Sequence, residues 1–312
     1  MPRDSESEPQ SPGTLYVVAT PIGNLEDLSP HAERILSEAS LIAAEDTRVT
    51  RRLLAQRGLG KQPMLSFHDH NEMQRTREIL RKLQDGRDVA LVSDAGTPLI
   101  SDPGYRLVRA AAEAGLRVVA VPGPCAVVAA LSISGLPTDR FLVLGFLHRR
   151  SAKRRTALEE LRRERSTLVL FEAPHRMIET LVDLEAVLGD RQVVLARNLT
   201  KPHEQVLRGR ASEVRAVLAA QEFVAGELTL VVEGAADPDG EAWPEEVERA
   251  IERLLAEGLP PSQVQSIVSD VFQLNRKSVY QYILGKVHEP NVETPRAGGN
   301  PRWGRLRGGD NT

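Results

Sequence analysis

Several features that define common protein classes are missing from this sequence of 312 residues. There is one cysteine, Cys125, so an intramolecular disulfide and a zinc site built on several thiolates are both excluded. The longest uncharged run, residues 118–138, is interrupted by Pro122, Gly123 and Pro124, which favours a short strand and a short helix over a membrane span. Residues 1–12 lack the apolar segment of a secretory signal. We therefore expect a cytoplasmic protein with no membrane segment.

Two glycine-rich nucleotide-binding motifs are also missing. No G-x-G-x-x-G follows the first predicted strand and no G-x-x-x-x-G-K-[ST] occurs anywhere, so neither a Rossmann nicotinamide enzyme nor a P-loop nucleotidase is supported. The formal net charge is −3, which argues against a surface that is basic all over. The length allows about two domains and a smaller additional unit.

Predicted strands and helices alternate over most of the chain, as in α/β proteins with a mostly parallel sheet. The strands expected first are 14–20, 41–44, 64–67, 89–92 and 117–121. A second α/β domain is expected after Pro137, with strands 141–146, 167–171, 192–196 and 228–232, and with helices near 152–164, 175–188 and 211–220.

The remainder has an all-helical pattern. Residues 244–257, 262–272 and 277–284 are predicted helices, and the tight turn before the last one is similar to a helix-turn-helix. A helical appendage that only packs or dimerises fits equally well. The expected divisions are a tail at 1–12, α/β domains at 13–124 and 125–235, a helical module at 236–290 and a tail at 291–312.

Three loops rich in glycine and proline follow predicted strands of the first domain. They are residues 21–24 (PIGN), 93–98 (SDAGTP) and 121–124 (VPGP). Ligands of open α/β sheets bind at the carboxyl ends of strands, where such loops let a ligand approach the backbone. Each loop alone has a purely geometric explanation, but together they favour a binding site.

The loops belong to a series of eight distinctive motifs. They are LYVVATPIGNLEDLS (15–29), LIAAEDTR (41–48), FHDHNE (67–72), ALVSDAGTPLISDPGYRLV (90–108), VPGPCAVVAALSISGLPTDRF (121–141), FEAPHR (171–176), ARNLTKPHE (196–204) and GELTLVVEG (226–234). In this order they resemble one branch of the tetrapyrrole (corrin/porphyrin) methylase superfamily, the branch that methylates a cytidine 2′-hydroxyl of bacterial 16S ribosomal RNA. The C-terminal helices also resemble that branch's appended module.

The resemblance implies two α/β domains with S-adenosylmethionine in the cleft between them, and a homodimer. No metal site is expected from the residues themselves. Carried over by position, the cofactor-binding residues are Pro21, Gly23, Ser93, Asp94, Ala95, Gly96, Thr97, Cys125, Ala126, Phe171, Glu172, Arg210 and Leu228. Cys125 is expected to be a wall residue and not a nucleophile, since no basic neighbour in sequence lowers the pKa of its thiol.

The chemistry of 2′-O-methylation needs alignment of the hydroxyl with the methyl group and removal of a proton. We expect Asp46 or His68 to orient or deprotonate the hydroxyl, and Arg48 to hold a backbone phosphate. The alternative for Asp46 and Arg48 is a capped helix start with a local ion pair. For His68, Asp69 and His70 the alternative is capping of the next helix, and a metal site is disfavoured.

Recognition of RNA requires local positive charge. Residues 148–165 hold eight basic and three acidic residues, and Arg149, Arg150, Lys153, Arg154 and Arg155 form the candidate phosphate-binding patch. A solvated helix face is the alternative. The implied partner is 16S rRNA in the small ribosomal subunit.

Two other functions remain open at this stage. A tetrapyrrole C-methyltransferase shares the cofactor cleft but acts on a macrocycle. A non-catalytic nucleic-acid-binding protein would use only the C-terminal helices.

Overall fold

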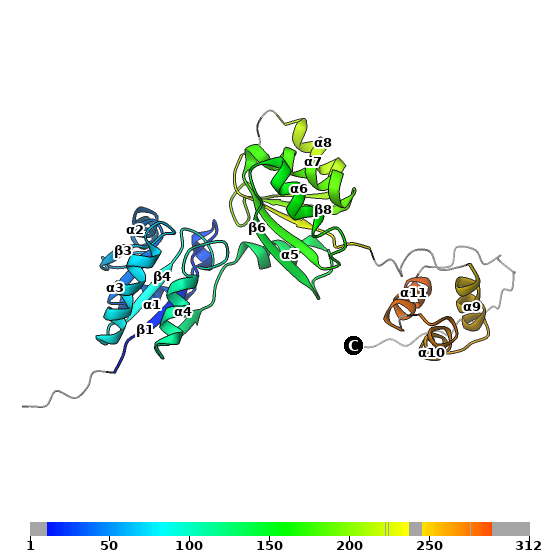
Figure 1. The fold of residues 1–312 in the computed structure, drawn as a ribbon, viewed down its shortest axis with the longest axis horizontal. Helices are drawn as coiled ribbons and strands as arrows, with labels where there is room; N and C mark the ends of the chain where they lie inside the picture. Colours follow the sequence, from blue (N-terminus) through cyan, green and yellow to red (C-terminus); the bar gives the residue numbers. More distant parts are fainter. Residues whose placement is uncertain (1–10, 222, 224, 237–244, 275, 289–312) are drawn as a thin grey trace, which may run out of the picture. The chain divides into compact units, whose positions relative to one another are not determined.

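The computed structural model describes residues 11–221, 223, 225–236, 245–274 and 276–288. The chain forms two compact units, residues 1–235 and 236–312 (Figure 1). The predicted tails at 1–12 and 291–312 lie outside the described residues, apart from residues 11 and 12. No helix in the described part combines the length and the apolar character needed to cross a membrane.

The first sheet has five parallel strands in the order β3-β2-β4-β1-β5. The strands are β1 (Thr14–Val18), β2 (Leu41–Ala44), β3 (Met64–Ser66), β4 (Val89–Val92) and β5 (Arg117–Val121). The helices that connect them are a 3-10 turn (η1, Leu25–Asp27), α1 (Pro30–Glu38), α2 (Thr47–Gln56), α3 (Glu72–Gln84) and α4 (Tyr105–Glu113). Crossovers through helices are the usual way to join parallel strands.

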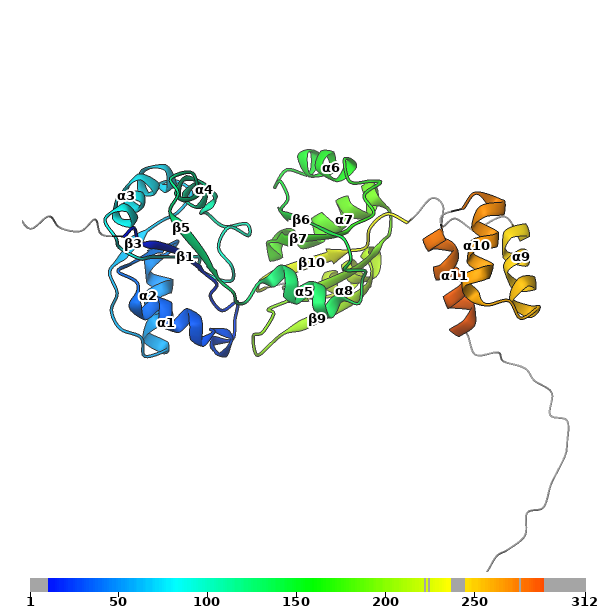
Figure 2. The same cartoon turned by 90° about the horizontal axis from the view of Figure 1, so that it is seen from below.

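Helices cover both faces of this sheet (Figure 2). Val18 and Val92 pack in the core under α1 and α2, whereas Leu15 and Leu91 pack in the core under α3 and α4. β2 and β4 are buried at every position for this reason, and their sequences are apolar throughout. α1 begins after Ser29, whose hydroxyl accepts a hydrogen bond from the backbone N–H of Ala32 at 3.1 Å, and Pro30 occupies the first helical position.

The second sheet has five strands in the order β6-β7-β10-β8-β9, of which only β6 and β7 are parallel. The strands are β6 (Phe141–Phe146), β7 (Thr167–Glu172), β8 (Gln192–Arg197), β9 (Gln205–Arg210) and β10 (Leu228–Val232). The helices are α5 (Ala126–Ser134), α6 (Ser151–Glu159), a 3-10 turn (η2, Pro174–Arg176), α7 (Met177–Leu188) and α8 (Ala211–Ala219). α6, α7 and α8 cover one face, and α5 packs on the other.

The two α/β sheets expected from the sequence are confirmed, and the strands at 41–44, 89–92, 117–121, 141–146 and 228–232 have the predicted bounds. β9 was not predicted. Its sequence, QVLRGR, has little apolar character, and the strand is held at the sheet edge by its antiparallel pairing with β8. The predicted helix at 152–164 is shorter, ending at Glu159.

The described residues of the second unit form three helices, α9 (Glu245–Ala256), α10 (Pro261–Phe272) and α11 (Arg276–His288). They share one apolar core, formed by Val247, Ile251, Val264, Val268, Val279 and Ile283. α10 ends at Gln273, whose φ of 54° lies in the left-handed region. The expected three helices of this module are therefore present, whereas part of the turn before α11 lies outside the described residues.

Candidate active site

The three predicted ligand loops meet at the carboxyl edge of the first sheet. Thr20 and Gly96 exchange two backbone hydrogen bonds, of 2.8 and 3.0 Å. The Thr97 hydroxyl donates to the carbonyl oxygen of Pro124 at 2.9 Å. These hydrogen bonds join the loops after β1, β4 and β5, which are adjacent strands, into one platform. The convergence expected from sequence is thus present.

The loop after β1 also contacts the second domain. The backbone N–H of Asn24 donates to the Thr200 hydroxyl at 3.0 Å. A Cβ on Gly23 would lie 2.5 Å from the Lys201 side chain and 2.8 Å from the Leu199 carbonyl oxygen. Gly23 is therefore required for this close approach between domains.

A cavity of about 310 Å³ opens between the platform and the second sheet. Its wall is mostly apolar, with Asp102, Glu172 and Glu227 as the acidic residues. The lining residues are Ile22, Ala95, Ile100, Ser101, Asp102, Ala126, Phe146, Phe171, Glu172, Ala173, Pro174, Leu199, Gly226, Glu227, Leu228 and Thr229. A small-molecule site typically has this size and this character.

Five predicted cofactor residues line the cavity, namely Ala95, Ala126, Phe171, Glu172 and Leu228. Seven others lie in the adjoining loops without lining it: Pro21, Gly23, Ser93, Asp94, Gly96, Thr97 and Cys125. Cys125 is half-buried against the apolar cluster under α5, as expected for a wall residue.

The prediction for Arg210 is wrong. Leu228 pairs with Arg197 at one end of β8, whereas Arg210 pairs with Gln192 at the other end. Five residues of strand separate these ends, a distance of about 17 Å. Arg210 instead donates to the Asp190 carbonyl oxygen at 2.8 Å, next to the start of α8.

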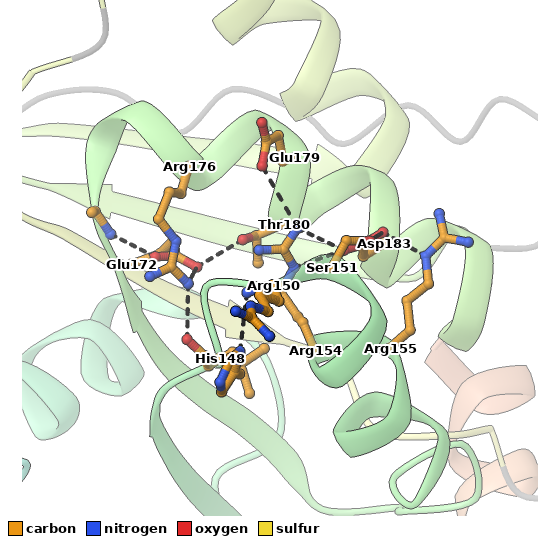
Figure 3. Close-up of polar contacts among 12 residues, drawn as sticks. His148, Arg150, Ser151, Arg154, Arg155, Glu172, Arg176, Glu179, Thr180 and Asp183 are labelled. Atoms are coloured by element: carbon orange, nitrogen blue, oxygen red, sulfur yellow. Dashed lines mark hydrogen bonds and ion pairs between the residues drawn. The ribbon is translucent and has the colours of Figure 1, made fainter.

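Glu172 shapes the cavity wall and does not present a free charge. Its side chain is fully buried. Its carboxylate accepts hydrogen bonds from the backbone of Ala173 (2.8 Å), from Arg176 (3.0 Å) and from the Thr180 hydroxyl (2.7 Å) (Figure 3). A carboxylate can be buried when its oxygens accept hydrogen bonds in this way.

Asp102 is the residue of the site that sequence reasoning missed. It lines the cavity, and burial raises the pKa of its carboxyl to about 6, with a smaller contribution from the nearby charges of Glu45, Asp94 and Asp69. The preceding residue, Ser101, has a φ of 67°, and strained backbone of this kind clusters at functional sites. The only signal available in the sequence is the SDPG segment, which by its composition indicates no more than a turn.

Asp46 and Arg48 form a capped helix start with a local ion pair, which is the alternative that the sequence left open beside a catalytic role. The Asp46 carboxylate caps α2 through the backbone N–H of Arg48 at 2.8 Å. It also accepts from the Arg48 guanidinium at 3.0, 3.1 and 2.5 Å. The hydrogen bonds from Arg48 lower the pKa of Asp46 to about 2. Asp46 is therefore a weak base, while the Arg48 side chain remains 84% exposed.

His68 lies in a turn before α3 that Asn71 closes. The Asn71 side chain accepts from the His68 backbone N–H at 2.9 Å and lies 3.1 Å from the His68 Nε2. α3 has no side-chain cap, so the capping alternative for residues 68–70 is wrong. Among the described residues, no three His, Cys, Asp or Glu side chains are grouped as a metal site.

The predicted basic patch divides into two groups, and Figure 3 shows Arg154 and Arg155 of the first group beside Asp183. Arg154 is only 1% exposed and forms an ion pair with Asp183 at 2.6 Å, so it is wrong as a phosphate-binding residue. Arg155 also binds Asp183, at 2.6 Å, and is half-exposed. Burial alone raises the pKa of Asp183, but the hydrogen bonds from Arg155, Ser151 and Arg154 outweigh this and hold it below its usual value.

Arg149, Arg150 and Lys153 are exposed. Within the described part of the chain, none of the three has a carboxylate partner. These side chains are therefore available to bind phosphate, and the alternative of a solvated face with intrahelical pairs does not describe them.

Known proteins share this fold and these motifs. The family model for Tetrapyrrole (Corrin/Porphyrin) Methylases matches residues 14–215. A uroporphyrin-III-C-methyltransferase from Thermus thermophilus is 26% identical, with a TM-score of 0.50, over 70% of this chain and 94% of that one. The fold and the cavity thus define a methyltransferase.

Curated relatives narrow the class. Two proteins named Ribosomal RNA small subunit methyltransferase I are close in sequence. The protein from Xylella fastidiosa (strain Temecula1) is 48% identical over 86% of this chain and 98% of its own length. The protein from Escherichia coli O157:H7 is 44% identical over 90% and 98%. The chain therefore belongs to the tetrapyrrole methylase family, in the branch of the small subunit ribosomal RNA methyltransferases I, which confirms the expected resemblance.

Proposed function

We propose that this chain transfers a methyl group from S-adenosylmethionine to the 16S ribosomal RNA of the small subunit. The cavity between the three-loop platform and the second sheet is the observation that carries this proposal. The names of the relatives supply the class of substrate. Neither alternative, a macrocycle methyltransferase or a non-catalytic binding protein, is favoured by these relatives.

The residues of the cavity suit this cofactor. Ile22, Phe171 and Leu228 offer an apolar wall to an adenine ring. When bound, the cofactor supplies an electrophilic methyl group. The loop at 93–97 holds the cofactor against the sheet edge, and Ala126 closes the wall from α5.

The acceptor we propose is the 2′-hydroxyl of a cytidine. Such a transfer requires a base within hydrogen-bond reach of the hydroxyl. We assign this role to Asp102, because it lines the cavity and because a carboxyl with a pKa of about 6 is mostly ionised at neutral pH and still basic. Asp46 then acts by orienting Arg48 and not by accepting the proton.

Binding of the RNA backbone completes the proposed mechanism. The exposed Arg48 guanidinium binds one phosphate near the sheet edge, and His68 orients the nucleotide beside it. Arg149, Arg150 and Lys153 bind further phosphates, with Arg155 at the border of the patch. Arginine is suited to this task because its planar guanidinium matches phosphate geometry.

We further propose a homodimer that acts in the cytoplasm. β6 is an edge strand, and its Phe141, Leu142 and Val143 side chains are 47%, 37% and 39% exposed. Exposed apolar edges favour pairing with another chain. Light scattering of the purified protein is expected to give twice the mass of one chain, and Leu142→Lys is expected to shift the mass toward one chain.

The direct test is methyl transfer from radiolabelled S-adenosylmethionine. Purified small ribosomal subunits, free 16S rRNA and uroporphyrinogen are offered separately as acceptors. Label is expected in the rRNA of the subunits, on a cytidine ribose that resists alkaline cleavage. Label only in the macrocycle, or on a base, would overturn the proposal.

A further inference from the structure

The cavity has an aromatic side chain at its open side, and the proposed chemistry leaves this side chain without a role. Phe146, the last residue of β6, lines the cavity and yet is 62% exposed. Aromatic residues make up only 4% of the chain. A phenylalanine left in water beside a binding site costs hydrophobic stabilisation, which a ligand recovers by covering the ring.

A β-bulge directs Phe146 toward the cavity. Val143 pairs with Val169, but the next pair is Gly145 with Leu170, so one extra residue enters β6. Gly145 has a φ of 64°, which favours glycine. Phe146 consequently pairs with Phe171. In a regular strand Phe146 would pair with Glu172 and would face the side of the sheet that α6, α7 and α8 cover.

The bulge creates a two-ring wall. The rings of Phe146 and Phe171 lie 5.6 Å apart at an angle of 44°. Phe171 is half-buried in β7, the strand next to the edge strand β6, and packs in the cluster under α5. Phe146 lies on the edge strand, between Phe171 and solvent. Phe171 thus lines the buried part of the cavity, whereas Phe146 lines the part that is open to solvent.

Positive charge follows Phe146 directly in the chain. Arg149 and Arg150 come three and four residues later, within about 11 to 14 Å of extended chain. Together with Lys153 they have no carboxylate partner among the residues that the structure describes. An aromatic ring beside unpaired cations is the arrangement that holds a single unstacked nucleotide, with its base on the ring and its phosphates on the cations.

We propose that Phe146 is the stacking platform for the nucleobase whose ribose is methylated, taken out of its own stack. The ring fixes the base at the cavity's open side and so brings the adjoining ribose toward the loop at 101–102. This inference rests on the proposed function, because it takes RNA as the methyl acceptor. It makes Phe146 a substrate-binding residue and leaves cofactor binding to Phe171 and to the three loops after β1, β4 and β5.

The test compares Phe146→Ala and Phe146→Trp with Tyr105→Ala, all in the full chain. Tyr105 is the matched control, since it is 65% exposed on α4 and does not line the cavity. Three quantities are measured: S-adenosylmethionine affinity by calorimetry, kcat/KM for methylation of small ribosomal subunits, and oligomeric mass by light scattering.

For Phe146→Ala we expect kcat/KM to fall about 5- to 150-fold, the range that corresponds to removing the ring from beneath one stacked base. Cofactor affinity and mass are expected to stay within twofold of wild type. Phe146→Trp is expected to retain kcat/KM within about threefold, because indole also stacks. Tyr105→Ala is expected to match wild type.

Three outcomes would overturn the inference. They are an equal fall in cofactor affinity, a change in oligomeric mass that accounts for the lower activity, and an unchanged kcat/KM. Failure of the proposed function is distinguishable, because wild type itself would then transfer no methyl group to the subunits.

Discussion

At the scale of single residues, two aspartates near the same sheet edge have opposite chemistry. Asp46 is bound by Arg48, which lowers its pKa to about 2. Asp102 is half-buried beside other carboxylates, which raises its pKa to about 6. Environments that push two carboxyl pKa values apart often separate their roles. The structure thus favours Asp102 as the proton acceptor and Asp46 as the support of Arg48.

The activity of an Asp102→Asn variant tests this assignment. Wild-type kcat/KM for subunit methylation is expected to rise with pH and level off above a midpoint near 6, since Asp102 must be ionised to accept a proton. Asp102→Asn is expected to lower kcat/KM about 10²- to 10⁴-fold and to abolish the acid limb. Asp46→Asn is the control, and its kcat/KM is expected to fall at acid pH as in wild type. A midpoint near 6 that persists in Asp102→Asn would contradict the role.

Asp102→Asn should lower activity but raise the stability of the folded protein. The folded-state pKa of Asp102 lies above its unfolded value, so its ionised form is disfavoured by folding. Wild type is therefore expected to gain stability from this residue as pH falls from 7 toward 4. Asp102→Asn should raise the melting temperature at pH 8, by an amount that shrinks toward pH 4. An advantage that does not change with pH would contradict the raised pKa.

The sequence predicts that the three ligand loops lie together, and the structure joins them at one sheet edge. It misplaces the side chains of Arg154 and Arg210 and misses Asp102, in each case because the environment is built by distant parts of the chain. Arg154 is buried by Asp183, which is 29 residues away. Arg210 lies far from Leu228 because of the register of β8 and β9, which no local pattern reveals. The pKa of Asp102 depends on burial and on Glu45, which belongs to another strand end.

At the scale of elements, the α6–α7 pair depends on one buried charge network. Asp183 accepts from Ser151, Arg154 and Arg155 at 2.9, 2.7 and 2.6 Å (Figure 3). These bonds hold the start of α6 on α7, and α6 carries Lys153. The network therefore fixes the position of α6, and with it the position of Lys153.

Removal of the Arg154 side chain should destabilise the fold. Arg154→Ala removes the buried ion-pair partner of the Asp183 carboxylate, a change that typically costs about 3 to 5 kcal/mol when a buried pair is broken. Arg149→Ala, a change at an exposed position close by, is expected to alter the free energy of unfolding by less than about 0.5 kcal/mol. Urea unfolding of both variants measures this difference, and equal stabilities would show that the network contributes nothing.

Substitution of Arg149 and Arg150, the exposed arginines of the patch, should weaken RNA binding without affecting stability. Replacing Arg149 and Arg150 by Gln is expected to weaken binding to small subunits and to reduce the slope of log K against log salt by about 0.7 to 0.9 for each phosphate that the variant no longer neutralises. Arg34→Gln, on α1 and paired with Glu38, is the matched control. A salt slope that stays at the wild-type value in the double variant would exclude the patch from RNA binding.

Elements were predictable where one signal dominates. β4 and β10 are short apolar runs buried on both faces, and their predicted bounds are those observed. β9 could not be predicted, because its sequence has neither an apolar run nor a clear alternation and its strand conformation depends on β8. The bulge in β6 was equally hidden, since it shows only in the pairing of β6 with β7.

At the scale of the whole molecule, the two units have separate cores. Every residue that lines the cavity belongs to the unit of residues 1–235. A fragment of residues 1–236 is therefore expected to bind S-adenosylmethionine within about twofold of the full chain's affinity, as measured by calorimetry. A fragment that is folded by circular dichroism but binds no cofactor would show that the helical unit completes the site.

The net charge of the molecule illustrates why composition alone is a weak guide. The total of −3 argues against a nucleic-acid partner, yet residues 148–165 alone carry eight basic and three acidic side chains. Three of these cations have no carboxylate partner within the described part of the chain. Binding to RNA over one limited face needs only such a patch.

The most direct measurement is the transfer of radiolabelled methyl from S-adenosylmethionine to purified small ribosomal subunits, followed by mapping of the modified nucleotide. The account predicts one labelled cytidine in 16S rRNA, modified on its ribose 2′-oxygen, by wild type and not by Asp102→Asn. Label on a base, on no RNA at all, or at full rate with Asp102→Asn would contradict it.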